Sequence, residues 1–201
     1  MDSLEWELNR DKYVQKMEDI KNFPKDGDLC LHLGCGEGIL DKWINIDKYY
    51  EDPRVIKKDI YLLNYPENSV DAIYSSHSLE HLPVRHARLA LKNWVKILKP
   101  GGKLFLAIPD LEETMRCILN KDISFLDRYT WFLHVLFGYQ ASSSERDLTL
   151  DSPVDYGQFH TCGFTEELIV FYLLDDGYDI IELYHYNGWD TPSMYIEAVK
   201  K

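Results

Sequence analysis

Residues 28–38 read DLCLHLGCGEG, a short apolar strand that ends in a glycine-rich turn. Glycine lets the backbone turn sharply and lets a ligand approach without meeting a β-carbon. In open α/β sheets ligands bind at the carboxyl ends of the strands, which is where this turn would lie. Gly34, Gly36 and Gly38 follow the spacing G-x-G-x-G, whereas dinucleotide sites favour G-x-G-x-x-G. The stretch predicts a candidate ligand-binding turn, although a tight turn without a ligand would also explain it.

The segments around this turn alternate between strand and helix patterns. Short apolar runs bounded by turn-forming residues predict strands at 44–47, 55–57, 70–75 and 103–110, with two more near 178–186 and 193–200. Apolar residues at three- and four-residue steps predict helices within 1–24, from Pro83 to Pro100, and over 165–175. The alternation predicts one domain over 1–201, with a mostly parallel sheet and helices on both faces, a three-layer α/β/α sandwich.

The composition is that of an acidic globular chain. Hydrophobic residues make up 45% of the 201 residues, which is too many for a disordered chain, and the formal net charge is −12. Proteins that grip nucleic acid present a basic face, so the charge argues against a nucleic-acid partner. No apolar run approaches the roughly 20 residues that span a bilayer, and the N-terminus carries no signal-like apolar stretch. The four cysteines form no C-x-x-C pair, so we expect reduced thiols in a cytoplasmic protein. With no spanning segment and an acidic charge, we expect no membrane partner.

Four ordered blocks give the sequence a family resemblance. They are LHLGCGEG at 31–38, D-I-x-x-L-x-x-P-E-N-S-V-D at 59–71, HSLEHL at 77–82 and ILKPGGKLFLAIPD at 97–110. In this order and spacing they resemble the class I S-adenosylmethionine-dependent methyltransferases over residues 28–110, with a looser similarity over 160–200. The run WINID at 43–47 is similar to small methyltransferases of the methyltransferase-11-like type, often linked to surface sugars. The resemblance implies a Rossmann-like sheet of seven strands, the last antiparallel, and S-adenosylmethionine as cofactor, with S-adenosylhomocysteine as product.

The resemblance also implies roles for individual residues in binding the cofactor. The glycine turn would line its methionine and ribose part, Asp47 would bind the ribose hydroxyls, and Asp59 with the Ile60 backbone would meet the adenine. Ser75, Ser76 and His77 would border the sulfonium. The complete expected set is Leu33, Gly34, Cys35, Gly36, Asp47, Lys48, Asp59, Ile60, Ser75, Ser76 and His77.

Two features depart from the family pattern. Family members usually carry an acidic residue two positions before the first glycine, where this chain has His32. The helix that normally follows the glycine turn has little room, because only GILDKWIN at 38–45 leads into the second strand. The contact that an acidic residue makes with the turn or the cofactor is therefore in doubt.

Histidines are the natural candidates for activating an acceptor. A sulfonium is already a strong electrophile, but a hydroxyl acceptor benefits from a general base with a pKa near neutrality. His77, His81 and His160 are the candidates, each with a packing or loop-bracing role as the alternative. Asp110, His134 and His160 could converge on a divalent ion, but nothing in their spacing supports this, and we expect no metal.

Residues 111–160 interrupt the alternation of strands and helices. Helical segments near 111–120 and 123–138 precede a polar loop, ASSSERDLTLDSP, at 141–153. Insertions of this length are usually functional, so we expect an acceptor lid, with a plain surface loop as the alternative. Candidate acceptor-binding residues are Tyr139, Gln140, Asp155 and Tyr156.

The expected reaction is methyl transfer to an oxygen or nitrogen nucleophile of a small molecule or sugar. A non-catalytic regulatory protein that only binds S-adenosylmethionine is the main alternative, and His32 with the shortened first connection would favour it. A nicotinamide-dependent oxidoreductase on a similar sheet is a second alternative, distinguished by its cofactor.

Overall fold

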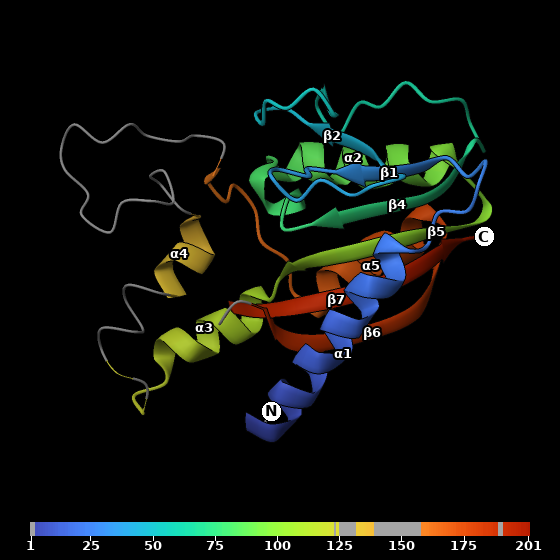
Figure 1. Ribbon diagram of the computed structural model, residues 1–201. Coiled ribbons are helices and arrows are strands. Elements are labelled where there is room, and N and C mark those ends of the chain that lie inside the picture. The colour runs from blue at the N-terminus through green and yellow to red at the C-terminus, as the bar shows by residue number, and fades with distance from the viewer. Residues whose placement is uncertain (1–2, 123, 125–131, 139–157, 189–190) are drawn as a thin grey trace, which may run out of the picture.

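A seven-stranded sheet forms the centre of the computed structural model (Figure 1), which describes residues 3–122, 124, 132–138, 158–188 and 191–201. The strands are β1 (Cys30–Leu33), β2 (Ile44–Asp47), β3 (Val55–Lys57), β4 (Val70–Ser76), β5 (Leu98–Pro109), β6 (Tyr178–Gly188) and β7 (Thr191–Lys200). They lie in the order β3-β2-β1-β4-β5-β7-β6. Strands β1 to β5 pair in parallel, and β7 runs antiparallel to both β5 and β6. This confirms the predicted Rossmann-like sheet with an antiparallel last strand.

The register brings the carboxyl ends of three parallel strands to one edge of the sheet. Leu33, the last residue of β1, is opposite Ile46 of β2 on one side and Ser75 of β4 on the other. Every residue of β1 is buried, as expected for a parallel strand covered on both faces. Gly34 and His77, which follow β1 and β4, and Asp47, the last residue of β2, therefore lie side by side.

Helices cover both faces of the sheet. On one face, α2 (Val84–Ile97) and α5 (Glu166–Asp176) pack on the larger apolar core, and the hydroxyl of Thr165 caps α5 by accepting from the Leu168 amide at 3.3 Å. On the other face, α1 (Ser3–Lys21) lies across β6 (Figure 1), over a second core rich in tyrosine. Helix α1 is the helix expected within residues 1–24. None of the helices in the described ranges has the length and apolar character needed to cross a membrane.

The connection from β1 to β2 contains no helix. The Asn45 side chain organises it instead, because its amide donates to the carbonyls of Leu40 and Trp43 at 3.0 and 3.1 Å. His32 contacts the same amide, with Nδ1 3.1 Å from Oδ1 of Asn45, and stacks on the Tyr74 ring at 4.8 Å. Burial lowers the pKa of His32 to about 4, so the ring is neutral. The unexpected histidine therefore braces the shortened connection from inside the sheet.

Two short helices lie beyond the carboxyl edge of the sheet. Helix α3 (Leu111–Leu119) begins at Asp110, whose carboxylate accepts from the Glu113 amide at 3.1 Å. Helix α4 (Phe132–Phe137) lies next to it (Figure 1), and both fall within the helical segments expected between 111 and 138. A single turn of 3-10 helix, η1 (Leu79–His81), follows β4 at the same edge.

Candidate functional site

The glycine turn after β1 has a backbone that requires glycine at its first position. Gly34 has a φ of 67°, and a β-carbon there would lie 2.2 Å from the β-carbon of Ser78. The amides of Gly34 and Cys35 both donate to the Ile46 carbonyl, at 2.8 and 3.3 Å. Gly36 has a φ of 48°, and a β-carbon there would meet no atom within 4 Å. The turn therefore packs tightly against Ser78 at Gly34, whereas the space beside Gly36 is free of protein atoms.

Asp47 lies directly beside this turn. Its Oδ2 accepts from the Gly36 amide at 2.9 Å, and its Oδ1 accepts from the amides of Tyr49 and Tyr50 at 2.7 and 2.9 Å. A carboxylate has about four acceptor positions, so these three donors leave one. The carboxylate is held rigidly with one position for a ligand hydroxyl.

The residues after β2 and β3 form the outer rim of this region. Lys48 and Asp59 make an ion pair of 2.9 Å between Nζ and Oδ1, and both side chains are partly exposed. Ile60 is only 6% exposed, and its carbonyl accepts from Nε1 of the buried Trp94 at 2.8 Å. The Ile60 side chain is therefore part of the core, and the ion pair is the polar feature at this rim.

The segment after β4 joins the glycine turn. The hydroxyls of Ser75 and Ser78 lie 2.6 Å apart, and Ser78 Oγ donates to the Leu33 carbonyl at 3.3 Å. His77 has a φ of 46°, and its amide donates to the Ala107 carbonyl at 2.9 Å. Ser75 is fully buried, so it can only support the site from beneath. Ser76 is partly exposed, and its Oγ lies 3.5 Å from the hydroxyl of Tyr13.

Two further residues of the expected cofactor set, Leu33 and Cys35, are buried. Burial raises the pKa of the Cys35 thiol to about 12, so the thiol is protonated at neutral pH. Their contribution to any ligand site is therefore the backbone that shapes the turn.

The three histidines predicted as candidate bases surround one buried carboxylate, that of Glu80. Nδ1 of His77 lies 3.6 Å from Glu80 Oε1, and Nε2 of His160 lies 4.0 Å from the same oxygen. The rings of His81 and His160 meet edge to face, with centroids 4.8 Å apart. Glu80 was not among the residues predicted from the sequence. The sequence feature that could have identified it is a carboxylate between two histidines in HSLEHL.

Burial and charge act in opposite directions on these groups. Burial raises the pKa of Glu80, but the neighbouring His77, together with His81 and His160, outweighs burial and lowers it to about 2. Burial lowers the pKa of His160. The pKa of Glu80 is thus lowered only by positively charged neighbours, so an ionised Glu80 requires a positive charge beside it.

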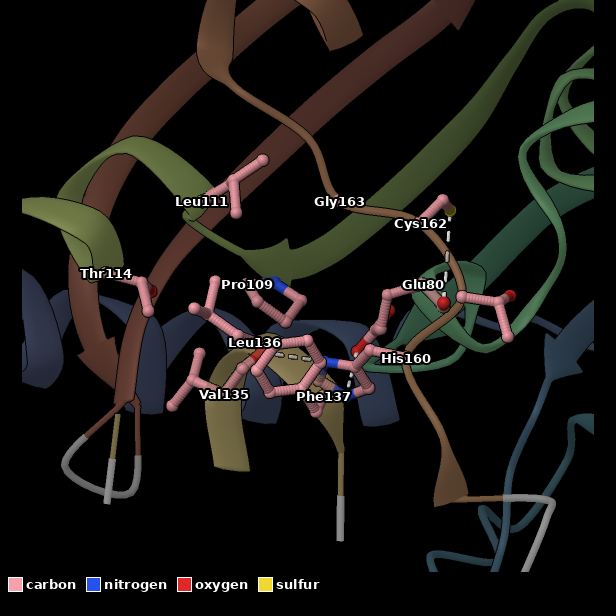
Figure 2. A pocket seen from close by; sticks show the side chains of 11 residues that line it. Glu80, Pro109, Leu111, Thr114, Val135, Leu136, Phe137, His160, Cys162 and Gly163 are labelled. Carbon is pink, nitrogen blue, oxygen red and sulfur yellow. Dashed lines mark hydrogen bonds and ion pairs between the residues drawn. The ribbon is translucent and has the colours of Figure 1, made fainter. Parts of the chain in front are cut away.

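A cavity of about 200 Å³ opens beside Glu80 and His160 (Figure 2). Its wall is mostly apolar, with Glu80 and His160 supplying the ionisable groups. The lining residues are Glu80, Pro109, Leu111, Thr114, Val135, Leu136, Phe137, His160, Thr161, Cys162 and Gly163. The Glu80 carbonyl accepts from the amides of Thr161 and Cys162 at 2.8 and 3.2 Å, which ties the two sides of the cavity together.

Other candidates from the sequence lie elsewhere. The Asp110 side chain contacts His185 and not the residues around Glu80, with its Oδ2 2.7 Å from Nδ1 of His185. Nε2 of the same ring lies 2.8 Å from the Glu166 carboxylate. The trio of Asp110, His134 and His160 does not converge. Within the described residues, the side chains whose ligand atoms lie within 4.8 Å of one another are instead those of Glu80, His81 and His160. The four acceptor-binding candidates Tyr139, Gln140, Asp155 and Tyr156 lie outside the described residues.

The comparisons with known proteins concern the domain and its fold. Residues 45–106 match a family described as a methyltransferase domain. No curated protein matches the chain. The chain is similar to a SAM-dependent methyltransferase from Methanosarcina mazei, with 17% identity, a TM-score of 0.62, and coverage of 90% of this chain and 96% of the other.

Two more solved structures are similar at low sequence identity. Magnesium protoporphyrin IX methyltransferase from Synechocystis, with SAH bound, gives 17% identity, a TM-score of 0.57, and coverage of 95% and 81% of the two chains. An S-adenosylmethionine-dependent methyltransferase from Mesorhizobium loti gives 14% identity, a TM-score of 0.51, and coverage of 87% and 91%. At such identities these likenesses concern the fold.

Proposed function

We propose that this chain is a class I S-adenosylmethionine-dependent methyltransferase and that it methylates an oxygen or nitrogen nucleophile of a small molecule or sugar, with a hydroxyl favoured. The reaction would break the bond between the sulfonium sulfur and its methyl group as the new bond forms, leaving S-adenosylhomocysteine. The single observation that carries the proposal is the carboxyl edge of β1, β2 and β4, where the glycine turn, Asp47 and the histidine cluster stand next to one another.

The cofactor half of the proposal rests on the glycine turn and Asp47. The open side of Gly36 leaves space for a ligand, and the remaining acceptor position of Asp47 suits a ribose hydroxyl. Lys48 and Asp59 offer a polar rim where the adenine would lie. Leu33, Cys35, Ile60, Ser75 and Ser76 would act through the backbone or by shaping this edge.

The acceptor half rests on the cavity beside Glu80. An apolar wall with a few convergent polar groups is typical of small-molecule sites. Six of its lining residues, Leu111, Thr114, Val135, Leu136, Phe137 and His160, come from 111–160, which supports a lid function for that segment. The net charge of −12 disfavours a nucleic-acid acceptor, and four free cysteines support a reducing, cytoplasmic setting.

A histidine next to Glu80 would take the proton of the acceptor. Methyl transfer mainly needs the nucleophile held in line with the methyl group, and a base adds to this when the nucleophile is a hydroxyl. Neutral His160 has Nδ1 2.7 Å from the Val135 carbonyl, so Nδ1 carries the proton and Nε2 has a lone pair to accept one. We assign His160 as the base, with His77 and His81 as positioning residues around Glu80.

Calorimetric titration tests the cofactor half first. We expect micromolar binding of S-adenosylmethionine and S-adenosylhomocysteine and no binding of NAD. Asp47→Ala should weaken binding, whereas Glu67→Ala, which removes an exposed carboxylate elsewhere, should not. Equal binding by Asp47→Ala and the parent protein would refute the proposed cofactor position.

A second experiment tests the acceptor half. Sugars and small hydroxyl compounds would be incubated with methyl-labelled cofactor, and label in the product would be measured for the parent protein and His160→Ala. The base assignment predicts that His160→Ala binds S-adenosylhomocysteine normally but transfers far less label. Binding without transfer to any acceptor in the parent protein would instead favour a regulatory role.

A further inference from the structure

Glu80 is a buried carboxylate with no hydrogen-bond partner in the part of the chain that the structure describes. The residue is 1% exposed, and among the described residues neither Oε1 nor Oε2 has a donor within hydrogen-bond distance. The two nearest ring nitrogens, on His77 and His160, stand off at 3.6 and 4.0 Å. A buried carboxylate is unfavourable unless it is hydrogen-bonded, paired at close range or coordinates a metal. Within the described ranges no side chain comes within hydrogen-bond distance of this carboxylate, so its oxygens are available to ligate a cation.

The surrounding histidines are held with a lone pair available. Nδ1 of His81 lies 3.1 Å from the Phe159 carbonyl, and Nδ1 of His160 lies 2.7 Å from the Val135 carbonyl. A carbonyl only accepts hydrogen bonds, so each Nδ1 carries the proton and each Nε2 is unprotonated in the neutral ring. Histidines that bind metals almost always donate their other ring N–H to a carbonyl or carboxylate in this way. Both rings therefore have the tautomer of a metal ligand.

The ligand atoms are close enough to share one ion. Glu80, His81 and His160 each offer one atom, and these atoms lie within 4.8 Å of one another. Bonds of about 2.0–2.2 Å to a tetrahedral ion place ligand atoms about 3.3 Å apart, so modest side-chain rotation closes the site. We propose that Glu80, His81 and His160 bind a divalent transition-metal ion at the wall of the cavity.

The ligand types select the kind of ion. Two imidazole nitrogens and one carboxylate form the set found in catalytic zinc sites and in non-haem iron sites, both of which keep coordination positions open. Magnesium and calcium prefer oxygen ligands throughout, so they fit less well. Nδ1 of His77 lies 3.6 Å from the same Glu80 oxygen, but His77 is not one of the three residues whose ligand atoms lie within 4.8 Å of one another. The site suits Mn²⁺, Fe²⁺ or Zn²⁺ and leaves room for a further ligand from the cavity.

The position of the ion would give it a part in the reaction, an extension that rests on the proposed function. A bound cation lowers the pKa of an oxygen that coordinates to it. An acceptor hydroxyl in the cavity would ligate the ion, lose its proton to solvent, and attack the methyl group as an alkoxide or phenolate while the sulfonium becomes a neutral thioether. In the loaded protein Nε2 of His160 would hold the ion instead of acting as base. Of the oxygen and nitrogen acceptors considered above, such an ion favours a molecule with an oxygen nucleophile.

Titration of the metal-stripped protein tests the site without any acceptor. The protein would be treated with a chelator, exchanged into chelator-free buffer, and titrated calorimetrically with MnCl₂ and ZnCl₂, with MgCl₂ for comparison. We expect one Mn²⁺ or Zn²⁺ per chain and weaker binding of Mg²⁺. Glu80→Gln and His160→Ala should each lower the affinity by at least about tenfold, the minimum typical even for losses just outside a metal's own ligands.

His86→Ala is the matched control, because His86 stacks on Tyr61 and is not part of the cluster. It should bind the ion as the parent protein does. S-adenosylhomocysteine binding by each variant shows whether it is folded, and it tests the proposed function separately. The metal proposal is overturned if the parent protein binds neither Mn²⁺ nor Zn²⁺, or if Glu80→Gln and His160→Ala bind them as tightly as His86→Ala.

Discussion

Replacing Gly34 by alanine should damage the glycine turn more than the same change two residues later. The backbone at Gly34 has a φ of 67°, and the left-handed conformation costs a residue with a β-carbon about 1–2 kcal/mol. The new β-carbon would also come within 2.2 Å of the Ser78 β-carbon. Relieving such overpacking costs about 1–3 kcal/mol more. We therefore expect Gly34→Ala to lower the free energy of unfolding by about 2–5 kcal/mol.

Three further variants separate the steric clash from the backbone strain. Gly36→Ala has a comparable φ of 48° but open space around its β-carbon, so it should lose only about 1–2 kcal/mol. Ser78→Gly removes the clashing atoms and its hydrogen bond with Ser75, a loss of about 1–2 kcal/mol by itself. In the double variant of Gly34→Ala with Ser78→Gly the clash is gone. Its destabilisation should therefore be smaller than the sum of the two single effects by about 1–3 kcal/mol.

Urea denaturation followed by circular dichroism measures these differences. The slope of the transition should stay constant across the four variants, so that shifts in midpoint report stability. Calorimetric titration with S-adenosylhomocysteine would show whether the displaced turn still binds the cofactor. Equal midpoints for Gly34→Ala and Gly36→Ala, or strictly additive effects in the double variant, would refute the steric argument.

Three more changes have expected outcomes. Asp47→Ala removes the acceptor of three backbone amides, so urea denaturation should show a loss of about 1–3 kcal/mol together with weaker cofactor binding by calorimetry. Trp94→Phe removes the buried bond to the Ile60 carbonyl and should cost about 1–2 kcal/mol in the same denaturation assay, and an unchanged midpoint would contradict it. The carboxylate of Asp110, with Glu166, outweighs burial and raises the pKa of His185 to about 9, so this pair stabilises the fold below about pH 6.5 and its contribution falls as pH rises to 9. Unfolding free energies at pH 6 and pH 9.5 should differ by about 1–2 kcal/mol more for the parent protein than for His185→Asn, after allowance for solvent screening.

The sequence predicted the sheet because its signals are local. The strands are short apolar runs bounded by turn residues, and the apolar spacing from Val84 to Ile97 is that of a helix packed on one face. Glycine after β1 marks a turn for steric reasons that hold in any context. Asp47 comes to lie beside that turn because the paired parallel strands β1 and β2 end at the same edge of the sheet.

The arrangement around Glu80 was beyond prediction from local pattern. His160 reaches Glu80 across eighty positions of sequence, through a chain path that includes α3 and α4. Burial of Glu80 depends on that tertiary contact, and nothing in HSLEHL distinguishes a buried glutamate from a solvated one. The role of His32 was also hidden, because its partner Asn45 is defined only by the pairing of β1 with β2.

Residues 77–81 connect two regions that would otherwise be independent. Ser78 packs against the glycine turn, and Glu80, two residues later, lines the cavity and holds Thr161 and Cys162 through its carbonyl. A ligand at either end that fixes this short segment lowers the ordering cost for a ligand at the other end. Thermodynamic linkage makes such an effect reciprocal: whatever factor the first ligand adds to the affinity of the second, the second adds to the first. Either ligand could then bind first, and the concentrations of the two ligands would decide which one does.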